Sequence, residues 1–195
     1  MIGEAEWKAH AELVGQVMLA WSRNTHQLLR VFTHITGLGS PMAETLFFSH
    51  VSDAGQRKML LDLATAMELL PDPAAELKRI FKRLEKVAGA RNVAAHTPFG
   101  ITLFDLETGA WGPKVIPALG RHVDKRREAD VVRQLRKADV ELASIYDALE
   151  HWIVHTQYPE RLWGPGKTFV GGVSALGVPE RAQAVQNTDF NGFEG

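Results

Sequence analysis

One short segment of the sequence combines a permanent cation, a residue that titrates near neutral pH and an amide. Arg91 is followed directly by Asn92 and, five positions after the arginine, by His96. An arginine can hold a phosphate by two hydrogen bonds, and a histidine can accept or donate a proton near neutral pH. These residue types predict cleavage of RNA, with Asn92 orienting either group or contacting the phosphate.

The segment closes a predicted helix, because Thr97 precedes Pro98 and a residue before proline avoids the helical region. Helical geometry places Arg91 and His96 about 140° apart around the axis and ~7.5 Å apart along it. One copy therefore does not focus both side chains on a single point, whereas two copies meeting across a two-fold axis would gather them in one cleft. A glycine inside a helix is unfavourable, so Gly89 predicts that something packs close to its backbone. The other small residues around the motif are Ala88, Ala90, Ala94 and Ala95.

The segment Arg91-Asn92-Val93-Ala94-Ala95-His96 resembles the R-N-x-x-A-H form of the R-x4–6-H motif of the HEPN superfamily. The order of the predicted elements is similar too, with long helices first, the motif at the end of a later helix and a final long helix. The resemblance implies a metal-independent endoribonuclease, without a cofactor, in toxin–antitoxin, phage-defence or RNA-processing roles. It assigns phosphate and transition-state charge to Arg91, acid–base work to His96 and a polar auxiliary role to Asn92. The implied partners are a second copy of the chain, RNA, and an antitoxin or other protein.

Two other interpretations stay open. In the first, the chain is a non-catalytic dimeric binding or regulatory module in which Arg91 pairs with a carboxylate. His96 then merely ends a helix, where a cation suits the helix dipole. In the second, His151 and His155 hold a metal, since their spacing of four places both on one side of a helix. Trp152 between them indicates that the pair borders the core, which favours ordinary packed or surface histidines and no metal.

A second basic set lies before the last predicted helix. It would follow an RNA backbone if its positive charges shared one face. Acidic residues at 124, 128 and 130 dilute it, which favours a solvated helix start. The residues considered for RNA binding are Arg121, Lys125, Arg126 and Arg127.

The elements that must position the motif follow from the spacing of apolar residues. Residues 4–35 show helical periodicity, with Trp7 and Trp21 expected in the core and Asn24 off the apolar stripe. Gly37 ends this helix, and Ser40-Pro41 and Asp72-Pro73 are typical of helix starts. Further helices are predicted at about 42–51, 52–70, 72–96 and 124–156, and a β-hairpin at about 101–118.

These elements predict a mostly α fold. With the resemblance, this is a HEPN-like antiparallel bundle of about five helices, with a small hairpin after the motif helix. We expect a helical domain over 1–157 and an irregular C-terminal extension over 158–195, where glycine and proline replace the apolar pattern.

The composition of the chain excludes several classes of function. The 195 residues carry a net charge of −1, so any nucleic-acid partner would need a local basic patch. The absence of cysteine excludes disulfides, thiolate catalysis and cysteine zinc sites. Residues 1–7 lack the basic start and apolar run of a signal peptide, and no apolar stretch approaches the roughly 20 residues that span a bilayer. We expect a soluble cytoplasmic protein without a membrane partner.

Overall fold

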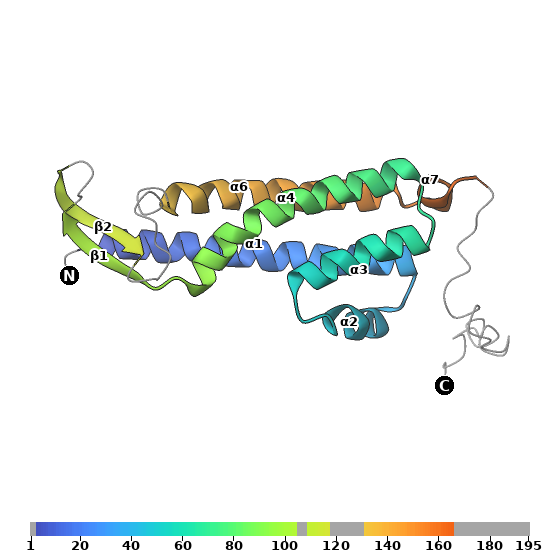
Figure 1. Cartoon of the computed structure of the whole chain (residues 1–195), viewed down its shortest axis with the longest axis horizontal. Coiled ribbons are helices and arrows are strands. Elements are labelled where there is room, and N and C mark those ends of the chain that lie inside the picture. The colour runs from blue at the N-terminus through green and yellow to red at the C-terminus, as the bar shows by residue number, and fades with distance from the viewer. Residues whose placement is uncertain (1–2, 105–108, 118–130, 166–195) are drawn as a thin grey trace, which may run out of the picture.

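The computed structural model describes residues 3–104, 109–117 and 131–165, which are mostly helical with one small antiparallel sheet (Figure 1). This agrees with the mostly α fold that the sequence predicts. The helices and strands are α1 (Glu4–Thr36), α2 (Ser40–Phe48), α3 (Asp53–Ala66), α4 (Pro71–His96), β1 (Phe99–Phe104), β2 (Trp111–Pro117), α6 (Val131–His155) and α7 (Pro159–Trp163).

The three long helices α1, α4 and α6 pack against one another and form the body, while α2 and α3 cover one end of α1 (Figure 1). α4 and α6 are antiparallel. Pro73, at the start of α4, accepts a hydrogen bond of 2.9 Å from Nε1 of Trp152, near the end of α6. Further along α4, Arg83 donates to Glu141, which lies earlier in α6.

α1 and α6 lie side by side and run in the same direction. Nδ2 of Asn24 donates to the carbonyl of Leu142 at 2.9 Å, and Nε2 of His34 lies 2.9 Å from Oγ1 of Thr156. The predicted antiparallel order thus holds for successive long helices, whereas the first and last are parallel because the chain reverses twice between them. We call these contacts the α1–α6 polar ladder; its members are Asn24, Gln27, Arg30 and His34 of α1, with Leu142, Glu150 and Thr156.

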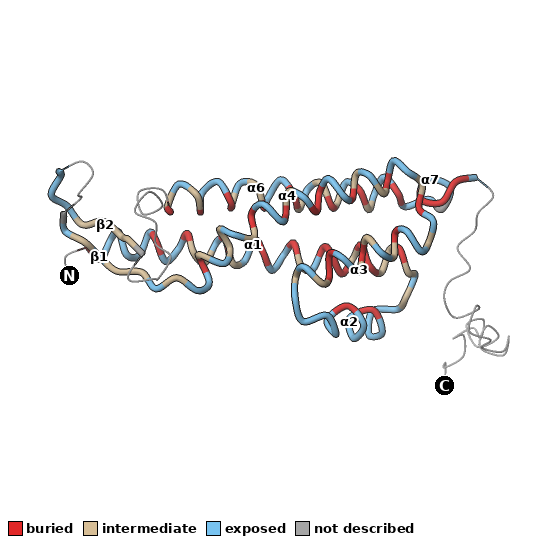
Figure 2. Tube along the Cα trace, in the orientation of Figure 1, coloured by how far each residue is buried: buried red, intermediate tan, exposed pale blue. Residues whose placement is uncertain are grey.

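The core lies between the long helices, whose facing sides carry the buried residues (Figure 2). The apolar periodicity explains this, because residues three, four and seven apart share one helix face. The side chains with no exposed surface include Val17, Ile35, Leu77, Leu142, Leu149 and Trp152. Trp21 is 5 % exposed and lies in the core as predicted, but Trp7 is 43 % exposed. The core prediction is wrong for Trp7, because the start of α1 extends beyond the body toward the hairpin (Figure 1).

Asn24 was expected off the apolar stripe, yet only 1 % of it is exposed. Its amide donates to a carbonyl of the same helix and to one of α6, which satisfies both amide hydrogens inside the core. Apolar periodicity cannot identify such a residue, because its buried position depends on a partner 118 residues away in the sequence.

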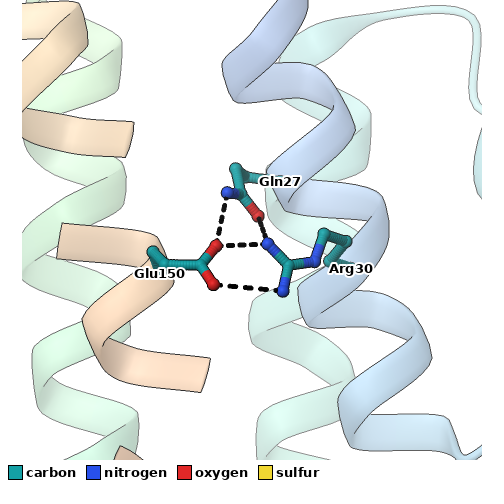
Figure 3. A network of polar contacts seen from close by, with 3 residues as sticks. All are labelled: Gln27, Arg30 and Glu150. Carbon is teal, nitrogen blue, oxygen red and sulfur yellow. Dashed lines mark hydrogen bonds and ion pairs between the residues drawn. The ribbon is translucent and has the colours of Figure 1, made fainter. Parts of the chain in front are cut away.

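Three members of the polar ladder form a network of hydrogen bonds (Figure 3). Nε2 of Gln27 donates to a carboxylate oxygen of Glu150 at 2.7 Å, and Arg30 donates to both oxygens of that carboxylate. Nη1 of Arg30 also donates to Oε1 of Gln27 at 2.9 Å. The hydrogen bonds from Arg30, and then from Gln27, lower the pKa of Glu150 below its usual value of 4.5.

Replacing Glu150 by alanine should lower the free energy of unfolding at pH 7, and this loss should shrink at low pH. A carboxyl group whose pKa is lower in the folded protein stabilises the fold above its unfolded pKa. That stabilisation is lost as the pH falls through the folded pKa. The Glu150 side chain is 39 % exposed, so solvent screening limits the effect to about 1 kcal/mol. Urea unfolding at pH 7 and pH 3 measures it, and an equal loss at both values would contradict the prediction.

The helix ends follow the sequence signals with two corrections. Gly37 ends α1 with a left-handed φ of 63°, and Oγ of Ser52 caps α3 by accepting from the amide of Gly55 at 3.0 Å. However, α2 begins at Ser40 itself, after Gly39, and α4 begins at Pro71, after Leu70. Ser40-Pro41 and Asp72-Pro73 therefore lie within the first turns, where proline is tolerated because the first amides have no helical partner.

The predicted hairpin is present as β1 paired with β2, and Ile101 lies opposite Val115. The structure adds α7, which the sequence pattern did not predict and which falls in the expected irregular extension. Its Leu162 is 1 % exposed, and the carbonyl of Leu162 accepts from the amide of Leu70 at 2.8 Å. The turn was expected around Thr108-Gly109; Gly109 has a left-handed φ of 68°, whereas residues 105–108, the expected last-helix start at 124–130 and the tail from 166 lie outside the described residues. Among the described helices, none has both the length and the apolar character needed to cross a bilayer.

Candidate functional site

The motif segment occupies the last turns of α4. His96 is the final residue of the helix, and Thr97 leaves it with extended backbone, φ −88° and ψ 120°. The amide of Thr97 still donates to the carbonyl of Val93 at 3.0 Å, so the last helical turn is complete. Pro98 explains the extended conformation of the residue before it. The predicted end of the motif helix is therefore confirmed.

Arg91 faces the interior of the fold. It lies seven residues after the buried Leu84 and so shares the inner side of α4. Its guanidinium carbon is 5.5 Å from the centre of the Trp21 ring, and its Nη2 is 3.8 Å from Oδ2 of Asp53. The side chain retains 25 % exposure. Nη1 donates to Oδ1 of Asn92 at 3.1 Å, so the structure brings these two motif residues together.

His96 lies on the opposite side of α4. It follows Gly89 by seven residues, and both are exposed, as is Asn92. No contact among the described residues joins Arg91 to His96. A single chain thus presents the imidazole to solvent and directs the guanidinium toward α1 and α3, in agreement with the angular separation expected from the sequence.

The structure corrects the prediction that a neighbour packs close to Gly89. A Cβ added to this glycine would meet no atom within 4 Å, so nothing in the described part of the chain packs against it. The expectation of a close neighbour is wrong within one copy, because the outer face of α4 is not covered by any other described element. The outer face of α4, defined here by Gly89, Asn92 and His96, is open.

Sequence reasoning missed two residues of α3, of which Asp53 lies beside Arg91. Asp53 is the first residue of α3, and Arg57 follows it by one turn on the same helix. Arg57 is only 9 % exposed, and its Nη1 has no hydrogen-bond partner among the described residues. Burial lowers the pKa of Arg57, while the nearby carboxylates of Asp53 and Glu85 oppose that shift. We call Trp21, Asp53, Arg57 and Arg91 the two-arginine cluster.

The sequence contains a weak signal for this cluster. Asp53 and Arg57 are four apart at the start of a predicted helix, and Gln56 and Leu60 show that this side of α3 is buried. The spacing alone suggests an ordinary surface pair. Only the packing of α3 against α1 and α4 reveals that Arg57 is removed from solvent.

The structure adds little support for the other candidate residues, which are the predicted RNA-binding set and the histidine pair. Arg121, Lys125, Arg126 and Arg127 lie outside the described residues. His151 and His155 are exposed, with their rings stacked 5.9 Å apart. Within residues 3–104, 109–117 and 131–165, no group of three or more histidine, aspartate or glutamate side chains could hold a metal ion.

A groove of about 650 Å³ lies between the start of α1, β2 and the start of α6. His10 lines it, is 6 % exposed and lacks a hydrogen-bond partner for either ring nitrogen among the described residues. Its ring packs against Phe99 at 4.2 Å, and burial lowers its pKa. No motif residue lines this groove.

Comparison of the chain with family models, with curated proteins and with solved structures gives no match. Its function is therefore inferred from the chemistry of its own side chains.

Proposed function

We propose that the chain is a metal-independent endoribonuclease of HEPN type that acts as a homodimer. The observation that carries this proposal is the placement of the R-N-x-x-A-H segment. It closes α4 with Asn92 and His96 exposed beside the uncovered Gly89. The resemblance implies toxin–antitoxin, phage-defence or RNA-processing contexts for such a protein.

The open outer face of α4 supports the dimeric form of the proposal. A helix crossing close to Gly89 meets no side chain there, so two copies of α4 can approach each other closely. Both His96 imidazoles and both Asn92 amides then face one cleft, with Arg91 at its inner edge. The pairing supplies the second set of groups that a single chain lacks, since its own Arg91 and His96 point to different sides.

The chemistry of the proposal requires only groups of this chain and RNA. An imidazole accepts the proton of a ribose 2′-hydroxyl, whose oxygen then bonds to the adjacent phosphorus. The bond from phosphorus to the 5′-oxygen breaks, and that oxygen takes up a proton. The products are a 2′,3′-cyclic phosphate and a 5′-hydroxyl. Arg91 stabilises the negative charge on the phosphoryl oxygens, and Asn92 orients the arginine through their hydrogen bond.

A second candidate function is a non-catalytic dimeric binding module. The contact between Arg91 and Asp53, together with the partial burial of Arg91, favours it, because both make the arginine part of the fold. In that case RNA cleavage is absent. Replacing Arg91 by alanine then changes only stability, through the loss of its contacts with Trp21 and Asp53.

The full-length protein incubated with RNA of mixed sequence in EDTA should cleave it. The products should carry 2′,3′-cyclic phosphate ends, because no metal-bound water takes part. The readouts are gel electrophoresis of the fragments and the sensitivity of their ends to a cyclic phosphodiesterase. Light scattering gives the oligomeric state in the same buffer. Activity that disappears in EDTA and returns with a divalent ion contradicts the mechanism, and binding without cleavage supports the second candidate.

A further inference from the structure

The outer face of α4 carries a row of lysines that leads toward the motif. Lys78, Lys82 and Lys86 follow one another at intervals of four residues, and all three are exposed. Residues four apart lie on the same side of a helix, and about 18 residues make five full turns. Lys78 therefore has the same angular position as His96, about 27 Å further back along the helix. We call Lys78, Lys82 and Lys86 the lysine row.

The lysine row has no role in holding the described fold together. No hydrogen bond or ion pair joins any of its members to another described residue. Arg83 of the same helix differs, because it donates to Glu141 at 2.7 Å and to Ser144 at 2.8 Å and so joins α4 to α6. The positive charges of the lysine row are therefore available to a partner.

This face is positive although the whole chain is nearly neutral. Between residues 78 and 86, the exposed residues of α4 are the lysine row, Arg79 and Glu85, so four positive charges stand against one negative charge. The 195 residues together carry a net charge of −1. A nearly neutral chain binds a polyanion through a local basic patch, and the lysine row provides one within the described residues.

The lysine row fits a nucleic-acid backbone better than it fits an acidic protein. Among the large apolar side chains that are exposed in the described part of the chain, none is on α4. Protein interfaces centre on buried aromatic and apolar side chains, whereas phosphates are held by lysine and arginine. Lysines one turn apart, about 6 Å along the axis, offer evenly spaced cations to successive phosphates of one strand.

We propose that the lysine row binds the phosphate backbone of an RNA strand that passes His96. This inference rests on the proposed function, since it takes RNA as the partner. The three lysines lie roughly 15, 21 and 27 Å from His96 along the axis, so they bind the strand away from the reacting phosphate and take no part in the chemistry. Two copies of α4 that cross at Gly89 diverge on either side of it, which leaves Lys78 and Lys82 open to the strand.

Lys78→Gln combined with Lys82→Gln should weaken RNA binding roughly 10- to 30-fold at about 0.1 M salt, because each lysine that contacts a phosphate releases counterions. The slope of log affinity against log salt concentration should become less steep by roughly 1.4, or about 0.7 for each lysine. The probe is a mixed-sequence 2′-O-methyl RNA, whose methylated oxygen cannot attack phosphorus, so only binding is measured. Fluorescence anisotropy of the full-length protein over a range of salt concentrations gives both quantities.

The matched control is Lys8→Gln combined with Lys58→Gln. It removes the same charge from two exposed lysines of α1 and α3, and it should leave the affinity and the slope unchanged. Lys78→Arg combined with Lys82→Arg keeps both charges on α4 and should also retain both values. Glutamine and arginine have nearly the helix propensity of lysine, so these exposed substitutions keep α4 intact.

Equal losses for the two double glutamine variants overturn the proposal, as do an unchanged slope for the variant of the lysine row and an absence of RNA binding at low salt. Polyglutamate that binds the lysine row more tightly than RNA of equal charge overturns it too, since the partner is then an acidic protein. Binding that depends on the lysine row without cleavage of ordinary RNA supports this inference and contradicts the nuclease. Cleavage that the variant of the lysine row leaves unchanged, at RNA concentrations below KM, contradicts this inference alone.

Discussion

Replacing His96 by alanine should reduce RNA cleavage by about 10²- to 10⁴-fold, the usual contribution of a general acid or base. The imidazole is exposed at the last residue of α4 and has no contact in the described chain that would make it necessary for the fold. The free energy of unfolding should therefore change by less than about 0.5 kcal/mol, as for other surface substitutions. Initial rates of fragment release in EDTA, with urea unfolding of the same preparation, measure both effects.

The matched control for this substitution is His26→Ala. His26 is also an exposed histidine, but it lies on α1 and outside the motif. Its loss should leave cleavage unchanged. If both variants keep full activity, His96 is not the catalytic group or the cleavage comes from a contaminant; if both lose activity to the same extent, the loss is not specific to the motif histidine.

Replacing Trp152 by alanine should destabilise the protein by about 3–5 kcal/mol, the cost of removing a large aromatic side chain from a core. Trp152 has no exposed surface, packs edge-on against His34 at 5.7 Å and donates to the carbonyl of Pro73. It therefore joins α6 to both α1 and the start of α4. Since a domain has only about 5–15 kcal/mol of stability, this change removes a large part of it.

Two further variants separate the causes of this loss. Trp152→Phe keeps an aromatic ring but removes the Nε1 donor, so it should lose roughly 1–3 kcal/mol through the unpaired carbonyl and the smaller volume. Val154→Ala, on the same helix with 52 % exposure, should lose less than about 0.5 kcal/mol. Urea unfolding gives all three values, and similar losses at Trp152 and Val154 would contradict the assignment of Trp152 to the core.

Much of the fold is predictable from the sequence because local signals determine helices. The apolar periodicity indicates α1, Gly37 predicts its end, and Thr97-Pro98 predicts the end of α4. The wrong predictions concern residues whose burial depends on tertiary packing. Trp7 has the right spacing for the core but extends past it, and Asn24 has the wrong polarity but finds a buried acceptor on α6. No local pattern carries that information.

For the candidate site too, some features follow from local geometry and others depend on tertiary packing. The angular separation of Arg91 and His96 follows from helix geometry, and the structure places them on opposite sides of α4, as expected. The direction in which Arg91 points depends on Asp53 of α3 and Trp21 of α1, which approach it only after folding. Spacing along one helix could not reveal a partner contributed by another.

The α1–α6 polar ladder has a consequence for how the two helices can move. Sliding α6 by one turn, about 5.4 Å, would carry Leu142, Glu150 and Thr156 past their partners. Gln27 and Arg30 would then lose the carboxylate of Glu150, and His34 would lose the hydroxyl of Thr156, which leaves these polar groups unpaired at the helix interface. Apolar side chains alone tolerate such a displacement, since one buried methyl group replaces another. The polar ladder therefore fixes the register of α1 and α6: one alignment of the parallel pair satisfies its hydrogen bonds, and alignments shifted by one turn do not.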